Sequence, residues 1–502
     1  MELDKNYGKI FCCVNNETKK AVLPVDCSII LPDYFPDVMK ILRYTAKTVK
    51  SPVFSEGGLE TVSGNINIEV NYISEEGELC SCSQLQPFSH GFDCGENIMA
   101  AEADVSVGEI GCRAVNKRRI DLHGSIEIVL KTVCGEERKT LSSAEGAGAV
   151  SKTENIETVS FVGEFYKHFT LEEKGEPGYG KPPFGKILRS SAVAEVTECH
   201  VIQDKIVTKG EVKVEVLWVP EEGFETEEKG PFISKFSFPV SRMVDAKGIL
   251  LSDICDASYE ADFPEINPSD DGQSISLKIK IGIFARVYRK ENFKYISDMF
   301  STEYEAKTEK EKITVINEAF PLSMTEPFFE KIDLPETADK VIDMWIENDS
   351  SKISQDGKIF IATKLCLFAK DPDGTPVYFE KLVEKEIASP TKGKNVVFHN
   401  LSVKTADKEF VITGDRKAEI SADMLIDGTA YVSLSTETVL ECSLSTEKKI
   451  EHGDFALTLC FAEKGEKIWD IAKKYRVSVE NIMKENDISE EILSEKKMII
   501  IA

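Results

Sequence analysis

The sequence is short of basic residues and of histidine, and it has no long apolar run. Its 61 lysines and arginines are outnumbered by 87 aspartates and glutamates, so the formal net charge at pH 7 is −26. Such an acidic chain repels phosphate backbones and anionic lipids, and we expect neither a nucleic-acid partner nor membrane insertion. No apolar run approaches the roughly 18–20 residues that a membrane helix requires. The N-terminal stretch also lacks a basic segment followed by an apolar one, so we expect a cytoplasmic protein without a secretory signal.

Sequence signatures of common enzymes are absent as well. We find no G-x-S-x-G, no P-loop, no H-E-x-x-H and no G-x-G-x-x-G after a strand pattern. The six histidines are scattered. Cys199 and His200 are adjacent, but neighbours on a strand point to opposite faces, so they are not expected to form a nucleophile–base pair. We therefore predict a protein that is not an enzyme and needs no cofactor.

Thirteen cysteines are present, an odd number in a chain without a visible secretory signal. This favours free thiols in a reducing compartment over a framework of disulfides. One cluster needs its own interpretation, because zinc would accept its four side chains. Cys80 and Cys82 share one face of a strand, where free cysteine packs as a small apolar residue. We prefer core packing and predict no metal; a zinc site is the alternative for Cys80, Cys82, His90 and Cys94.

The tetrapeptide KILR occurs twice, at residues 40–43 and 186–189. A glycine follows each copy at the same distance, because Gly64 and Gly210 each lie 24 residues after the lysine of the motif. Each glycine opens an alternation of apolar and polar residues, GNINIEVNY in the first case and GEVKVEVLW in the second. A period of two is typical of a half-buried β-strand, so the two segments predict copies of one β-rich module.

A third copy is predicted further along the chain. Gly64 and Gly210 are 146 residues apart (210 − 64), and a similar step leads to Gly357, which opens GKIFIATKL. The sequence KVID at 340–343 takes the place of KILR but lies closer to its glycine. A later strand pattern recurs in each copy, at residues 125–130, 274–283 and 430–434. The three glycines are thus predicted to occupy equivalent positions in three superposable, β-sandwich-like modules.

The predicted fold class is mainly β, with four domains. Glycine and proline are dense at 145–150 and at 175–183, where they would interrupt regular structure between the first two modules. A polar segment at 444–454 precedes a C-terminal region of different character. The predicted domains are three tandem β-modules, the third of them diverged, and a small C-terminal domain, at residues 1–140, 155–310, 315–445 and 453–502.

The C-terminal region predicts the order strand, helix, helix, strand. An apolar stretch at 455–461 and the closing KMIIIA predict the two strands. Apolar residues recur with the spacing of one helix face at Ile468, Ile471, Ala472 and Tyr475. A second helix is predicted to begin after Ser478, whose side chain suits an N-cap. One small core must then be shared by two helices and a two-stranded sheet.

Residues 464–488, KGEKIWDIAKKYRVSVENIMKENDI, resemble the LysM domain. Members of that family usually bind N-acetylglucosamine polymers in a shallow groove between two loops. The resemblance implies a partner-binding or glycan-binding groove made of Gly465, Glu466, Lys467, Ile468, Trp469, Asn486, Asp487 and Ile488. Lys467 replaces the usual threonine or serine, and Glu495 and Lys496 replace a usual Pro-Gly. These departures add charge beside the groove and weigh against sugar binding.

The β-modules resemble the SPOCS domain of spore-coat proteins. The resemblance rests on LPDYFPDVMKILRYTAKTVK at 31–50, KPPFGKILRSSAVAEVTE at 181–198 and LPETADKVID at 334–343. Several such modules followed by one LysM domain are similar to the SipL type of spore-envelope assembly protein. This similarity implies a scaffold in the mother-cell cytoplasm whose LysM domain binds a coat-anchoring morphogenetic ATPase on the forespore surface, with other spore-coat proteins as further partners. The alternative is LysM-mediated binding of peptidoglycan or another N-acetylglucosamine polymer.

Overall fold

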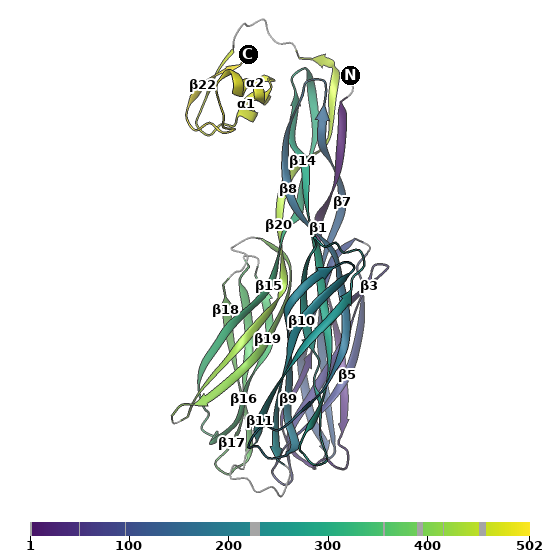
Figure 1. The fold of residues 1–502 in the computed structure, drawn as a ribbon, viewed down its shortest axis with the longest axis vertical. Coiled ribbons are helices and arrows are strands. Elements are labelled where there is room, and N and C mark those ends of the chain that lie inside the picture. The colour runs from purple at the N-terminus through teal and green to yellow at the C-terminus, as the bar shows by residue number, and fades with distance from the viewer. Residues whose placement is uncertain are drawn as a thin grey trace.

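The structure, a computed structural model, describes residues 3–49, 51–95, 97–220, 231–354, 357–388, 395–414, 416–450 and 458–501. Three β-sandwiches lie side by side, a narrow bundle of long strands extends from them, and a small domain with α1 and α2 lies near the end of that bundle (Figure 1). The fold is mainly β, as predicted. No helix in the described ranges is long and apolar enough to cross a lipid bilayer.

Each module is built from two antiparallel sheets around an apolar core to which both sheets contribute. In the first module, one sheet has the order β1-β7-β6, and the other has the order β2-β4-β3 with β5 paired to β4. The strands are β1 (Asp4–Ile30), β2 (Val38–Thr48), β3 (Val53–Glu56), β4 (Leu59–Ser74), β5 (Leu79–Asp93), β6 (Ile98–Asn116) and β7 (Arg119–Glu145).

The second and third modules repeat this plan. The second has the order β11-β10-β9 in one sheet and β12-β14-β13, with β8 paired to β14, in the other. The third has the orders β15-β20-β19 and β16-β17-β18. The strands of the second module are β8 (Ala149–Gly175), β9 (Phe184–Ile202), β10 (Lys205–Pro220), β11 (Phe232–Asp245), β12 (Ile254–Ala261), β13 (Glu265–Pro268) and β14 (Ile275–Ser301). Those of the third are β15 (Tyr304–Asp333), β16 (Lys340–Ile353), β17 (Ile359–Lys370), β18 (Pro376–Ile387), β19 (Val396–Ile412) and β20 (Lys417–Lys449).

The alternation seen in the sequence builds the cores. On β10, Val212, Val214 and Val216 are buried, and the charged residues between them lie on the other face. The corresponding residues of β4 and β17 are buried in the same phase. Side chains on a strand alternate between faces, so one apolar face of each strand meets the facing sheet.

The prediction that the three glycines are equivalent is wrong for one of them. Gly64 and Gly210 lie inside β4 and β10, each five residues after the start of its strand. Gly357 lies instead in the turn before β17, where its φ is +85° and its N–H donates to the carbonyl of Ser354 (2.9 Å). A tight hairpin turn requires this left-handed conformation, which glycine adopts at the least cost. The shorter hairpin also explains why KVID lies closer to its glycine.

Six long strands extend beyond the sandwiches and form a shared bundle, which we call the stalk (Figure 1). They are three antiparallel pairs, β1 with β7, β8 with β14 and β15 with β20, and the shortest strands have 27 residues. At about 3.3 Å per residue, a strand of that length spans roughly 90 Å. Apolar side chains from all three pairs fill the interior of the stalk, among them Ile10, Leu141, Ile156, Tyr295, Ile296, Val315 and Val439.

The chain passes from one module to the next at the tip of the stalk. The glycine-rich segment at 145–150 makes a tight turn from β7 to β8, in which Gly146 and Gly148 have φ values of +93° and +64°. β14 and β15 are joined in the same region by residues 302–303. The segment at 175–183 has a different place, because it connects β8 to β9 within the second module.

The C-terminal domain has the predicted βααβ order. It consists of β21 (Thr458–Ala462), α1 (Ile468–Tyr475), α2 (Val479–Glu485) and β22 (Lys497–Ile501). The Ser478 side chain accepts a hydrogen bond from the Asn481 N–H (3.1 Å), so it caps α2 as predicted. The start of the strand predicted at 455–461 and the end of the polar segment at 444–454 lie outside the described residues.

Candidate functional site

The two loops expected to form the LysM groove are hydrogen-bonded to each other. The Gly465 N–H donates to the Leu493 carbonyl (2.8 Å), and the Leu493 N–H donates to the Glu466 carbonyl (3.0 Å). Lys467 forms an isolated β-bridge with Ile492. Gly465 has a φ of +92°, which turns the chain sharply before α1. The side chains of Glu466 and Lys467 therefore stand exposed along a fixed loop edge.

Several groove residues have structural tasks of their own. Ile468 is fully buried in the domain core, and Ile488 is partly buried against it. The Asn486 side chain donates to the carbonyls of Ile482 and Ile500 (both 2.8 Å) and accepts from the Ile500 N–H (2.6 Å). It thereby joins the end of α2 to β22. Of the residues in the second loop, Asp487 has an exposed side chain.

Trp469 faces the stalk. Its Nε1–H donates to Oδ2 of Asp298 on β14 (2.8 Å), and its ring meets that of Phe300 edge to face at a centroid distance of 5.3 Å. Lys473, one turn further along α1, forms an ion pair with the same carboxylate (2.7 Å). We call this set the tip contact. It fixes the LysM domain to the stalk through the face of α1 that carries Trp469.

The charge of Asp298 is strongly stabilised in this contact. Burial alone would raise the pKa of its carboxyl group, but hydrogen bonds from Lys310, Lys473 and Trp469 outweigh that effect and lower the pKa to about 2. Sequence reasoning did not find Asp298, which lies 171 residues before Trp469. No motif surrounds it, and the two residues meet only because the stalk returns β14 to the level of the LysM domain.

The outer face of the LysM sheet is apolar and exposed. Phe461 is 71% exposed and Leu459 is 44% exposed on β21, and Met498 is 49% exposed on β22. Phe461 pairs with Met498 across the sheet, and Ile492 is 51% exposed in the loop before β22. We call these four residues the apolar sheet face. Sequence reasoning missed it, although the alternation of Leu459 and Phe461 with small buried residues was a usable signal.

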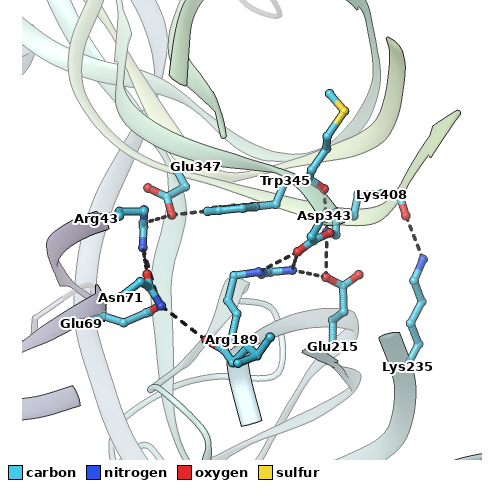
Figure 2. Close-up of polar contacts among 12 residues, drawn as sticks. Arg43, Glu69, Asn71, Arg189, Glu215, Lys235, Asp343, Trp345, Glu347 and Lys408 are labelled. Carbon is cyan, nitrogen blue, oxygen red and sulfur yellow. Dashed lines mark hydrogen bonds and ion pairs between the residues drawn. The ribbon is translucent and has the colours of Figure 1, made fainter. Parts of the chain in front are cut away.

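The KILR motif lies where the three modules meet (Figure 2). In each module the strand pairing skips one apolar residue, Leu42, Leu188 or Ile342, and the motif's last residue follows this bulge. The skipped residues pack together in one shared cluster with Trp345 and Phe368. The positions after the bulge are thus equivalent and are occupied by Arg43, Arg189 and Asp343.

The change from arginine to aspartate in the third module creates ion pairs between modules. Arg189 donates from Nε and Nη2 to Oδ2 of Asp343 (3.0 and 2.7 Å), and Asp343 is fully buried. Arg43 donates to Glu347 (2.6 Å). Burial alone would raise the pKa of Glu347, but Lys47 and Arg43 outweigh that effect and hold the pKa below its usual range. The motif therefore joins modules.

The thiol cluster considered for zinc is part of a core. Cys80 is fully buried and Cys82 is 7% exposed in the core of the first module, as the packing interpretation predicts. No group of three or more histidine, cysteine, aspartate or glutamate side chains in the described parts of the chain could hold a metal ion. Cys199 packs against the second core and the side chain of His200 is 65% exposed, so the two diverge as expected.

Two segments of the chain match known protein families. Residues 184–267 match the family described as SipL, SPOCS domain, and residues 463–501 match the LysM domain family. The first match runs from β9 into β13 of the second module, and both agree with the resemblances found in the sequence. No curated protein and no solved structure matches the chain. The two matches support a sporulation-related, non-enzymatic scaffold with a LysM domain for binding.

Proposed function

We propose that this protein is a spore-envelope scaffold in the mother-cell cytoplasm, whose LysM domain binds a coat-anchoring morphogenetic ATPase on the forespore surface. The observation that carries the proposal is the tip contact, in which Trp469 and Lys473 hold the LysM domain against Asp298 at the end of the stalk. A binding domain at the end of a long stalk is separated from the three sandwiches. That arrangement suits a protein that connects partners and leaves the sandwiches for other spore-coat proteins.

A protein partner agrees better with the LysM surface than a sugar does. The Trp469 ring packs on Phe300, and the Asn486 amide is bonded to backbone, so neither is free to bind a sugar. The exposed alternatives are the charged edge at Lys467 and the apolar sheet face around Phe461. An apolar patch beside charged groups is typical of a protein–protein interface.

Peptidoglycan is the competing ligand, because the loop edge from Gly465 to Lys467 keeps the place of the family's groove. The two ligands can be separated by experiment. We expect the full-length protein to bind the purified ATPase in a titration and to sediment little with insoluble peptidoglycan. Sedimentation that chitin oligomers compete away, without binding of the ATPase, would favour the glycan instead.

A charge reversal at Lys467 tests the binding surface. We expect Lys467→Glu to weaken binding of the ATPase about tenfold, because an exposed charge at the centre of an interface contributes on the order of 1–2 kcal/mol. Its melting midpoint should stay within about 1 °C of that of the unmodified protein, since surface substitutions change stability little. Lys484→Glu, the same change at an exposed position of α2, is the matched control. Equal affinities for both variants would move the interface away from this loop edge.

A further inference from the structure

Two cysteines of the second module lie close enough to react with each other. Cys199 is on β9 and Cys255 is on β12, and their Sγ atoms are 2.7 Å apart. A disulfide bond measures about 2.05 Å between its sulfurs. The remaining gap of about 0.7 Å can be closed by small rotations of the two side chains.

The position of the pair in the fold gives a bond between them a structural effect. β9 is an edge strand of the sheet β11-β10-β9, and β12 is an edge strand of the opposite sheet. Both thiols pack at the border of the second core and are partly exposed. A bond would join the two sheets along an open side of the sandwich. It would also enclose β10 and β11 in a covalent loop.

One of the two thiols is prepared for the first step. The Cys199 thiol and the Cys255 sulfur share a hydrogen bond, which lowers the pKa of Cys255 even though burial and the charge of Asp256 oppose the shift. Thiolate is the reactive form in thiol–disulfide exchange. Cys255 is therefore the expected attacking residue, and Cys199 stands beside it as the resolving one.

We propose that Cys199 and Cys255 form a redox-dependent disulfide that cross-links the two sheets of the second module. The oxidant is a small disulfide such as oxidised glutathione. The Cys255 thiolate attacks one sulfur of the oxidant and releases one glutathione thiolate. Cys199 then loses its proton to solvent and displaces the second glutathione from Cys255. Two protein thiols and one oxidised glutathione thus give one protein disulfide and two reduced glutathiones.

The test uses the full-length protein, reduced first and then equilibrated with oxidised glutathione. We expect intact mass to show the loss of two hydrogen atoms and a non-reducing peptide map to join the peptides that carry Cys199 and Cys255. The melting midpoint should rise by about 5–10 °C on oxidation, because a cross-link over a loop of this size restricts the unfolded chain. Cys255→Ser should abolish both changes. Cys134→Ser, at a partly buried cysteine of the first module, should leave both unchanged.

The proposal is overturned if glutathione remains attached at either cysteine without a cross-link, or if the map joins other cysteines instead. Differential alkylation of the unmodified protein provides a second measurement in case Cys255→Ser does not fold. Cys199 and Cys255 should lose reactivity together and before the other cysteines. Independent loss at the two positions would contradict the proposal.

Discussion

Removal of Arg189 should loosen the junction between the second and third modules. Arg189→Ala would leave the fully buried Asp343 with the ammonium group of Lys408 (2.7 Å) as a remaining ion-pair partner. Breaking a buried ion pair costs about 3–5 kcal/mol when the other charge stays unpaired. Because Lys408 still neutralises part of that charge, we expect the lower end of this range. The guanidinium also lies 4.9 Å from the ring centroid of Trp345, and loss of that contact adds about 0.5–1 kcal/mol.

Hydrogen exchange is the appropriate assay, since a chain of several modules does not unfold in one step. The amides of β9 and β16 should lose about 3–4 kcal/mol of protection in Arg189→Ala. The matched control is Lys209→Ala, which breaks an exposed pair with Glu198 (2.8 Å) in the same module. An exposed pair contributes about 0.2–1 kcal/mol, so this variant should change protection little.

The double exchange of Arg189 and Asp343 separates charge from packing. The variant Arg189→Asp with Asp343→Arg restores opposite charges at equivalent positions and should recover part of the lost protection. The reasoning fails if Arg189→Ala costs no more than Lys209→Ala. It also fails if the exchanged pair is as unstable as the two single variants added together.

Two further predictions concern the LysM domain and the strand glycines. Asp298→Asn should weaken the tip contact by about 1–2 kcal/mol, measured as faster exchange of the Trp469 indole N–H. Since the pKa of Asp298 is lowered to about 2, the contact's charge-dependent stability is present above the ordinary aspartate pKa of 3.8 and is lost as the pH falls towards 2; an indole signal unchanged down to pH 2 would contradict this. Gly210→Ala should destabilise β10 by about 3 kcal/mol or more in thermal melts, because the new Cβ would lie 2.0 Å from the Glu195 carbonyl oxygen. Gly57→Ala, at a turn with a φ of +58° and open space, should cost about 1 kcal/mol, and equal losses would exclude the close approach as the cause.

The sequence alone determined the local structure of this protein. Alternation along β4, β10 and β17 predicted which side chains are buried, because a strand sends successive residues to opposite faces. Helical spacing and the Ser478 cap predicted the LysM helices for a similar reason. These features depend on neighbours in the chain, so periodicity reveals them.

Tertiary structure decided how these parts are joined. The domain limits proposed at 140, 155, 310, 315 and 445 fall within β7, β8, β15 and β20, since those strands continue from the sandwiches into the stalk. The equivalence of Arg189 and Asp343 was hidden because the third hairpin is shorter and displaces Gly357 into a turn. Asp298 and Trp469 meet across 171 residues of chain. Such pairs are set by the packing of distant strands, and periodicity in one segment carries no information about them.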